Sequence, residues 1–303
     1  MKRTFSASGK LLISGEYAVL DGALALACPT KGGQHLSWEP APSENLYWRS
    51  LDAQGKPWFE AYFSADSLEL IRATDRAMAE RLREIFEVIL NRQPQWEFPL
   101  CGRVTSELDF DPQWGLGTSS TLISLLAQWA EIDPYELLEA TFGGSGYDIA
   151  CTQASGPIFY QIESSKNIRV KPAKFNPPFA DQLFFVYRNR KQNSRSAMKH
   201  YRAQEKPKGF LQEISTISQK LTSTTNLQEF RDLLQFHEEL LAGVLQQIPV
   251  QKDLFPDFEG QMKSLGAWGG DFILVATPME NPKVYFQKKG YPVVIPFSEM
   301  LLM

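Results

Sequence analysis

The sequence has few cysteines and no long hydrophobic segment. Its three cysteines, Cys28, Cys101 and Cys151, are too few and too far apart for a disulfide framework or a cysteine-rich metal site. No apolar run approaches the roughly 18 residues that a membrane-spanning helix needs. Lys10 and Glu16 interrupt any signal-peptide core near the N-terminus. These absences predict a cytoplasmic protein without a membrane partner.

The sequence also lacks an excess of positively charged residues. Lys and Arg number 31 against 35 Asp and Glu, a net charge of -4, so the chain lacks the basic surface with which nucleic-acid-binding proteins neutralise phosphates. The three histidines, His35, His200 and His237, show no metal-ligand spacing. His237 shares a helical stripe with apolar residues, which predicts a core or interface position. The length of 303 residues favours two domains.

The hydrophobic patterns predict a mixed α+β fold. Strand-like runs fill the first quarter, with a turn at Gly9 and Lys10 between residues 4–7 and 11–13. Apolar residues at helical spacing predict a helix from Met78 to Ile89. Helices and strands do not alternate regularly, which favours α+β over a doubly wound sheet. The later expected elements are helices over 194–201, 210–221 and 227–245 and a strand over 272–276.

A glycine-rich loop precedes an apolar helical pattern in the middle of the chain. It runs from Gly115 to Ser120 and ends in three hydroxyl residues. Glycines let a ligand approach the backbone closely, and the N–H groups at a helix start favour anions. A hydroxyl there can also join a Mg²⁺ shell. No Lys-Ser or Lys-Thr pair ends the loop, so the Walker A motif is absent. The alternative is a core helix capped by these hydroxyls.

Three further motifs contain residues suited to phosphate chemistry. Lys10 and Glu16 flank a glycine-containing segment, and Asp148 lies in a glycine-rich turn as a candidate general base. A last loop from Gly266 to Asp271 precedes a strand and can line a phosphate site. Each has a simpler explanation: a hairpin lysine, a turn aspartate that caps a helix, or a helix–strand turn. Together, four such loops in an acidic chain favour a phosphate-handling enzyme over a binding module.

In this order, the motifs resemble those of the GHMP kinase superfamily, which includes galactokinase, homoserine kinase, mevalonate kinase and phosphomevalonate kinase. The similar segments are residues 9–22, 114–121, 143–150 and 263–271. The resemblance implies an ATP- and Mg²⁺-dependent phosphotransferase of two domains. Residues 1–175 would form an ATP-binding domain like domain 2 of ribosomal protein S5, and residues 176–303 a ferredoxin-like domain.

Within the superfamily, the sequence looks most like the phosphomevalonate kinases. Residues 15–20 read Gly-Glu-Tyr-Ala-Val-Leu, where mevalonate kinases have histidine in place of Tyr17, and residues 269–271 read Gly-Gly-Asp. The resemblance therefore implies phosphomevalonate as the acceptor, in isoprenoid precursor synthesis. The alternatives are a mevalonate kinase, another acid or sugar kinase of the superfamily, a diphosphomevalonate decarboxylase, and a non-catalytic binding protein with this fold.

The resemblance also implies a role for individual residues. Asp148 would accept or orient the acceptor proton, Lys10 would keep Asp148 ionised, and Ser119 would ligate Mg²⁺. The implied nucleotide-binding residues are Gly115, Leu116, Gly117, Thr118, Ser119, Ser120, Gly266, Gly269 and Gly270. The implied substrate-binding residues are Glu16, Tyr17, Ser145, Gly146, Lys191, Asn193, Ser194 and Arg195. The expected partners are ATP and a phosphorylated or carboxylate-bearing alcohol, bound by a monomer or homodimer.

Two positions depart from the family pattern. Trp268 stands where the family usually has glycine, which predicts a narrower or closed last loop. Leu137 lies about where mevalonate kinases have a magnesium-ligating glutamate, with Glu136 and Glu139 nearby.

Overall fold

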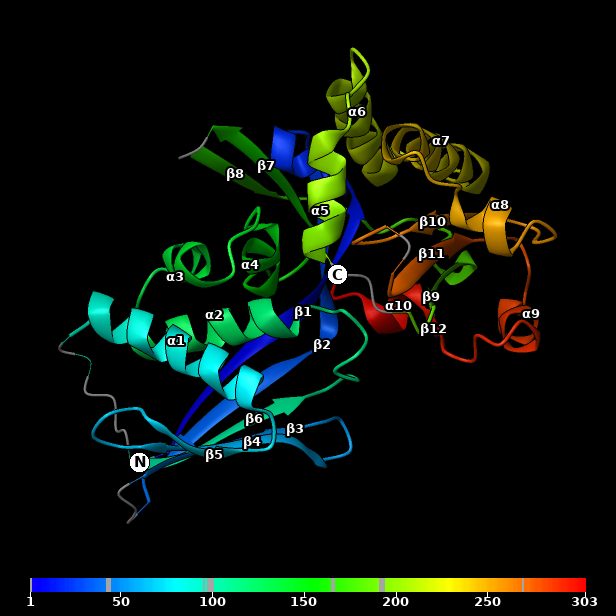
Figure 1. Cartoon of the computed structure of the whole chain (residues 1–303). Helices are drawn as coiled ribbons and strands as arrows, with labels where there is room; N and C mark the ends of the chain where they lie inside the picture. Colours follow the sequence, from blue (N-terminus) through cyan, green and yellow to red (C-terminus); the bar gives the residue numbers. More distant parts are fainter. Residues whose placement is uncertain are drawn as a thin grey trace. The chain divides into compact units, whose positions relative to one another are not determined.

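The computed structural model describes residues 2–41, 45–94, 96, 101–164, 167–190, 194–268 and 270–303 (Figure 1). The backbone forms two compact units whose segments alternate along the chain. Unit 1 comprises Met1–Gly9, Gly32–Pro112 and Gly117–Gln153, and unit 2 comprises Lys10–Lys31, Gln113–Leu116 and Ala154–Met303. The expected division into domains at residues 1–175 and 176–303 stays a prediction.

Unit 1 is a sheet with helices on one face (Figure 1). Its strands follow the order β5-β4-β3-β6-β2, and β1 pairs with β2. Strands β3 and β6 run parallel, and the pairs β2–β6, β3–β4 and β4–β5 are antiparallel. Buried residues alternate with partly exposed ones along β3 and β4, because successive strand residues point to opposite faces. The strands are β1 (Arg3–Ser14), β2 (Ala25–Glu39), β3 (Asn45–Leu51), β4 (Pro57–Ser64), β5 (Leu70–Ala73) and β6 (Gly102–Leu108).

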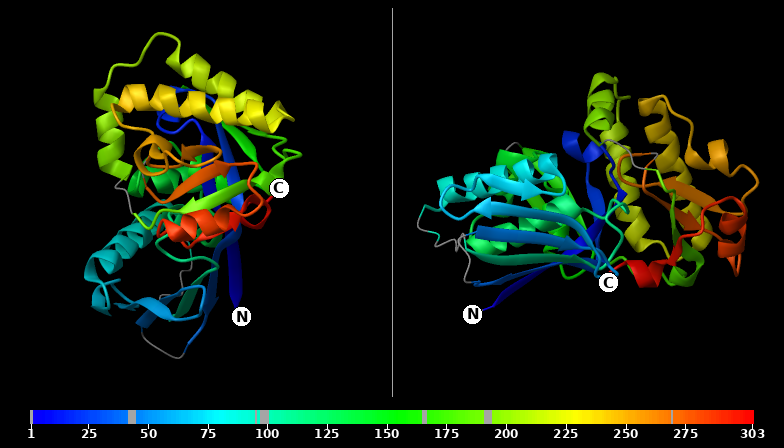
Figure 2. Two further views of the ribbon diagram at one scale, coloured as in Figure 1. Left: turned by 90° about the vertical axis from the view of Figure 1, so that its right-hand side faces the viewer. Right: turned by 60° about the horizontal axis from the view of Figure 1, so that its bottom comes forward.

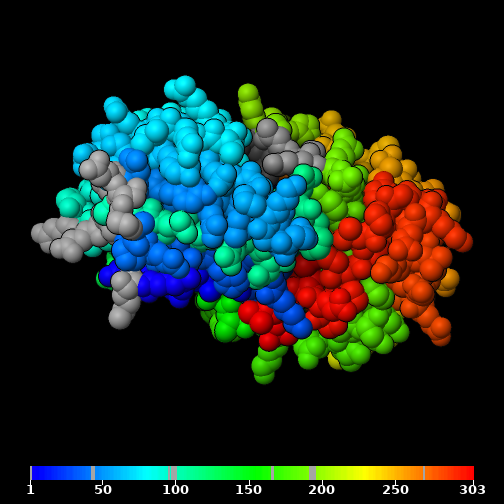
Figure 3. All heavy atoms as spheres, turned by 90° about the horizontal axis from the view of Figure 1, so that it is seen from below, coloured from blue at the N-terminus to red at the C-terminus, as the bar shows by residue number. Residues whose placement is uncertain are grey.

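The helices of unit 1 begin at sequence signals that cap them. Asp75 accepts the Met78 N–H at the start of α1, and Asp133 accepts the Tyr135 N–H at the start of α3. The apolar stripe of α1 is buried, as the helical spacing predicted. The residues of β3 to β5 form the light-blue part of the surface in Figure 3. The helices are α1 (Arg76–Arg92), α2 (Thr118–Ala130), α3 (Pro134–Thr141) and α4 (Tyr147–Thr152).

Unit 2 contains an antiparallel sheet in the order β10-β11-β9-β12, and α7 packs along β10 (Figure 2). The first residues of β2 pair with β7, which pairs with β8. The strands are β7 (Ile158–Ser164), β8 (Asn167–Pro172), β9 (Leu183–Tyr187), β10 (Gln261–Ser264), β11 (Phe272–Ala276) and β12 (Val294–Pro296). The helices are η1 (Ala18–Asp21), η2 (Ala180–Gln182), α5 (Ser194–Ala203), α6 (Phe210–Ser223), α7 (Leu227–Leu245), α8 (Val250–Leu254), α9 (Pro282–Lys288) and α10 (Phe297–Met300).

One prediction about the first quarter is wrong. Gly9 and Lys10 do not form a turn, because Arg3–Ser14 is one continuous strand that pairs with β2. Pairing with a neighbouring strand outweighs the local preference of glycine for turns. The helices expected over 194–201, 210–221 and 227–245 and the strand over 272–276 are confirmed. None of the helices in the described ranges is long and apolar enough to cross a bilayer.

Candidate functional site

The first half of the mid-chain glycine loop belongs to unit 2 and is fastened there at several points. The Tyr187 hydroxyl donates to the Gln113 carbonyl at 3.0 Å, and the Trp114 ring packs edge-on against Phe272. The Lys10 backbone N–H donates to the Leu116 carbonyl at 2.8 Å. The Lys10 ammonium lies 3.4 Å from the Gly115 carbonyl oxygen. The lysine selected from the sequence therefore lies beside the loop, with its charge at Gly115.

Gly115 is in close contact with the carboxylate of Asp271, which ends the last glycine loop. The Gly115 backbone has φ +66°, and a Cβ atom there would lie 1.9 Å from Asp271 Oδ2. The Arg188 N–H donates to the Asp271 carbonyl at 2.8 Å and fixes that residue's backbone. Glycine is required at position 115 for two reasons. Its backbone is in the left-handed region, and a Cβ atom would collide with the Asp271 carboxylate.

Substitution of Gly115 by alanine should therefore displace the loop. Gly55 provides a control outside the candidate site, because its φ is +75° and nothing lies within 4 Å of a Cβ placed there. We expect Gly115→Ala to weaken AMPPNP binding at least tenfold, a loss of about 1.4 kcal/mol or more. Gly55→Ala should lower the unfolding free energy by about 1 kcal/mol through backbone strain alone. Calorimetric titration with AMPPNP and thermal unfolding of both variants measure these effects. Equal AMPPNP affinities in the two variants would contradict the role assigned to Gly115.

The second half of the loop opens helix α2 in unit 1. Gly117 occupies the N-cap position with φ +98°, so no hydroxyl side chain caps this helix. The hydroxyls of Thr118, Ser119 and Ser120 lie in the first turn instead; Ser120 donates to the Gly117 carbonyl at 2.8 Å, and Ser119 is exposed. An N-terminal turn whose N–H groups are not capped by a side chain is suited to binding an anion.

Asp148 lies in the first turn of α4 in unit 1, preceded by Gly146 at the N-cap with φ +80°. Its side chain is half-buried. The pKa of Tyr135 on α3 is raised to about 12, mainly by burial and further by the charges of Asp133 and Asp148. The Asp148 carboxylate thus lies near a partly buried phenol. Its expected pairing with Lys10 joins residues of different units and stays a prediction.

A fully buried ion pair lies behind the first motif in unit 2. The Lys263 ammonium donates to Glu16 Oε1 and, at 2.9 Å, to the Ser264 carbonyl. The Gly15 N–H donates to His237 Nε2 at 3.1 Å, and that nitrogen lies 3.4 Å from Glu16 Oε2. Burial raises the pKa of Glu16, and Lys263 partly offsets this effect. Burial and Lys263 lower the pKa of His237 well below its usual value, so the imidazole is neutral. The core position predicted for His237 is confirmed.

A second buried carboxylate, Glu238, holds the start of the last glycine loop. Glu238 Oε1 accepts the Ser264 N–H at 3.0 Å and the Trp268 indole N–H at 2.8 Å. Burial raises the pKa of Glu238 to about 7, although Lys263 and these hydrogen bonds partly offset the effect. Trp268 is 2% exposed and packs in a core that includes Tyr17 and Tyr201. The indole thus belongs to the interior of unit 2.

The other predicted site residues are placed as follows. Tyr17 is buried and stacks on Tyr201, with ring centroids 5.4 Å apart. Ser145 is half-buried before Gly146. Lys191, Asn193 and Gly269 lie outside the described residues. Ser194 and Arg195 begin α5, and the structure describes their backbone but not their side chains. The roles assigned to all of these residues stay predictions.

The sequence alone indicated no individual role for Glu238, Lys263 or Asp271. A signal for Glu238 was present, because it follows Leu234 by four residues and precedes Leu241 by three, on the buried face of α7. A carboxylate on an apolar helix face requires a buried partner. The partners come from β10 and the last loop, however, and a single sequence does not reveal that pairing.

Magnesium binding stays a prediction, and the residues of unit 1 that could join nucleotide phosphates in holding the ion are Ser119 and Asp148. Ser119 presents an exposed hydroxyl, and Asp148 is a carboxylate of the same unit. Leu137 is fully buried, and the neighbouring Glu136 is paired with Arg92. No cluster of three or more His, Cys, Asp or Glu side chains suited to a metal occurs in the described part of the chain. Mg²⁺ in nucleotide sites commonly uses one or two carboxylates together with phosphates and water.

Solved structures show which proteins share this fold. No protein-family model matches the chain, and no curated protein matches its sequence. A mevalonate kinase is 14% identical, with a TM-score of 0.69 over 96% of both chains. Streptococcus pneumoniae phosphomevalonate kinase, in complex with phosphomevalonate and AMPPNP, is 16% identical, with a TM-score of 0.69 over 96% of this chain and 99% of that chain.

Lactococcus lactis galactokinase, complexed with galactose, is 12% identical, with a TM-score of 0.66 over 97% of this chain and 94% of that chain. At these identities the similarity is one of fold. The chain has the GHMP kinase fold, as the order of its motifs predicted.

Proposed function

We propose that the protein is an ATP-dependent GHMP kinase that transfers a phosphoryl group to a small anionic alcohol. The observation that carries the proposal is the position of Lys10, whose ammonium lies against Gly115 in the loop that leads into α2. A cation and a helix N-terminus without a side-chain cap are complementary to a triphosphate. The shared fold with kinases of mevalonate, phosphomevalonate and galactose supports the same class of reaction.

In this proposal the chain positions its substrates and balances charge. The first-turn N–H groups of α2 bind nucleotide phosphates, and the Ser119 hydroxyl helps to hold Mg²⁺, which supplies charge neutralisation of the transferred group. Asp148 accepts or orients the proton of the acceptor hydroxyl. Lys10 keeps its positive charge at the loop and stabilises negative charge on the transferred group.

Phosphomevalonate is the acceptor that we propose first. The Gly15–Leu20 motif with Tyr17 favours it over mevalonate, and a phosphomevalonate kinase with bound phosphomevalonate and AMPPNP shares the fold over nearly the whole chain. Mevalonate kinase and other acid or sugar kinases of this fold are the main alternatives. A diphosphomevalonate decarboxylase is disfavoured by the same motif, and a non-catalytic binding protein by the presence of Lys10, Ser119 and Asp148.

The test is a screen of ATP consumption with mevalonate, phosphomevalonate, homoserine, galactose and diphosphomevalonate as acceptors. We expect ADP formation with phosphomevalonate at kcat/KM at least tenfold above that with mevalonate. Preference for another alcohol would retain the kinase class and change the acceptor. Release of CO₂ from diphosphomevalonate would identify a decarboxylase instead. AMPPNP binding without turnover of any acceptor would favour a non-catalytic protein.

A further inference from the structure

The last glycine loop is attached to the rest of unit 2 at both ends. At its start, Glu238 Oε1 accepts the Ser264 N–H and the Trp268 indole N–H. At its end, the Asp271 carboxylate lies against Gly115, which Lys10 also contacts. The attachment at the start depends on a tryptophan at a position where the family pattern usually has glycine.

We propose that Glu238 is a positioning residue for nucleotide binding, acting through Trp268 on the start of the last glycine loop, residues 266–268. This inference rests on the proposed function, because it assumes that the loop lines the nucleotide site. Glu238 has no need of contact with the nucleotide. It fixes where β10 ends and where the loop turns, and tryptophan provides the donor that a glycine at position 268 would lack.

The geometry favours a specific positioning role over general core filling. Glu238 is 1% exposed, and an apolar residue in its place would fill the volume without the energetic cost of burying a carboxylate. Both carboxylate oxygens have hydrogen-bond partners: Oε1 accepts two N–H groups, and Oε2 lies 3.3 Å from the Ser264 hydroxyl. All three donors belong to the end of β10 and the last loop.

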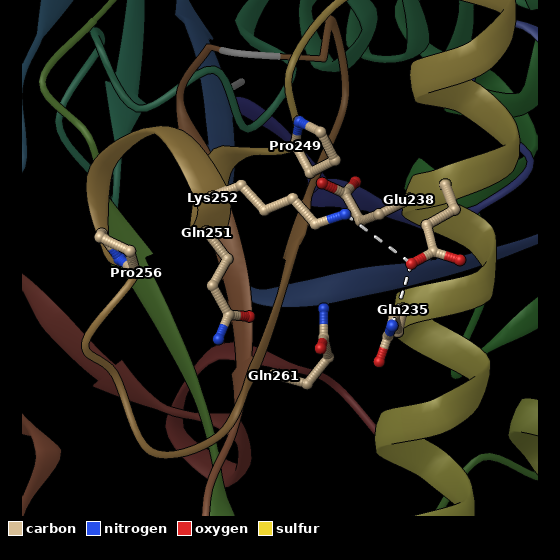
Figure 4. A pocket seen from close by; sticks show the side chains of 8 residues that line it. Gln235, Glu238, Pro249, Gln251, Lys252, Pro256 and Gln261 are labelled. Atoms are coloured by element: carbon tan, nitrogen blue, oxygen red, sulfur yellow. Dashed lines mark hydrogen bonds and ion pairs between the residues drawn. The ribbon is translucent and has the colours of Figure 1, made fainter.

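Glu238 also lines a hollow of about 360 Å³ (Figure 4). The hollow is lined by residues of α7, α8 and β10, among them Glu239 and Lys252, which lie 4.0 Å apart at their charged atoms. Glu239 follows Glu238 directly, is about half exposed, and accepts the Gln235 amide at 2.9 Å. It is a matched control, because it is a neighbouring glutamate on the same helix that pairs with Gln235 and Lys252.

The experiment combines Glu238→Gln and Trp268→Phe with the control Glu239→Gln. Each protein is labelled with ¹⁵N at its indoles, and AMPPNP affinity is measured by calorimetric titration. Trp268→Phe identifies the Trp268 resonance among the seven tryptophans. We expect this resonance to shift in Glu238→Gln, because a neutral amide oxygen is a weaker acceptor than a carboxylate. AMPPNP affinity should fall about tenfold in both variants, as for the loss of a charge-assisted hydrogen bond. Glu239→Gln should change neither quantity.

The pH dependence of the Trp268 resonance tests whether the Glu238 carboxyl acts on Trp268. The charged groups that act on Glu238 include Lys263, Glu16 and Arg188. In the unaltered protein the Trp268 resonance should titrate with a midpoint near 7, because burial raises the pKa of Glu238 to about 7. Glu238→Gln should remove this titration, and the control Glu239→Gln should retain it.

Each outcome has a defined meaning. AMPPNP affinity unchanged in both Glu238→Gln and Trp268→Phe would overturn the inference and leave the kinase proposal intact. Affinity that depends on Glu238, with no turnover of any acceptor, would support the inference and overturn the proposed activity. Failure of the unaltered protein to bind AMPPNP would overturn both. If Glu238→Gln does not fold, Trp268→Phe alone decides, because it removes the same hydrogen bond from the other partner.

Discussion

Replacement of Asp148 by asparagine should lower turnover by a factor of about 10² to 10⁴, the usual contribution of a positioned general acid or base. Asparagine preserves the shape of the side chain, so the first turn of α4 and the Gly146 N-cap are retained. What it removes is the negative charge and the ability to accept a proton from the acceptor hydroxyl. AMPPNP affinity should stay within about threefold, because the nucleotide phosphates are assigned to the loop and to α2.

The control for this prediction is Asp66→Asn, a neutralised aspartate that lies exposed between β4 and β5. It should retain full turnover. Steady-state kinetics with phosphomevalonate, AMPPNP titration and thermal unfolding of all three proteins separate a loss of chemistry from a loss of folding. Near-normal turnover of a folded Asp148→Asn variant would exclude Asp148 as the base.

Replacement of Lys263 by methionine should have the largest effect on stability. Lys263 and Glu16 have fully buried side chains, and the Lys263 ammonium is bonded to Glu16. Removing one partner of a buried pair leaves an uncompensated charge and typically costs about 3–5 kcal/mol. We expect chemical denaturation to show a loss of this size in the free energy of unfolding.

The loss should depend on pH in a defined direction. Burial raises the pKa of Glu16, and Lys263 is the main influence that lowers it. Without Lys263 the folded protein retains the Glu16 proton to higher pH, whereas the unfolded chain releases it above about pH 4.3. The folded state then binds more protons than the unfolded state, so the stability of Lys263→Met should fall as the pH rises from 5 to 8.

A double substitution, Glu16→Gln with Lys263→Met, isolates the cause of that loss. It removes both charges together and should be at least about 2 kcal/mol more stable at pH 8 than Lys263→Met alone, since a buried pair is often replaced by neutral groups at little cost. The double variant should also lose the pH dependence. A double variant as unstable as Lys263→Met would mean that lost packing, and not the unpaired Glu16 carboxylate, causes the effect.

Local sequence patterns were sufficient for much of the fold. The helices α1, α6 and α7 were evident from apolar residues at helical spacing, since each buries one stripe of its surface. The resemblance of the motifs to those of GHMP kinases indicated the GHMP kinase fold, which solved structures share over nearly the whole chain. The predicted turn at Gly9 and Lys10 failed because pairing with β2 extends the strand through both residues.

The candidate site was predictable only in part. Lys10 was selected from its sequence context, and its ammonium does lie at Gly115. Glu16 was selected for substrate binding, yet its carboxylate is fully buried and bonded to Lys263, which is 247 positions later in the chain. A glutamate after a glycine has the same local pattern whether it is exposed or buried.

Residue types and their spacing along the chain are sufficient to indicate the class of fold, the glycine loops and the lysine near them, because periodicity, turn preference and charge act over a few neighbouring residues. The partners of Glu16, Glu238 and Gly115 depend on the folded chain, because they come from segments more than 25 positions away. A buried charge is stabilised by whatever lies beside it in space, and contacts between such distant segments exist only after the strands and helices have packed.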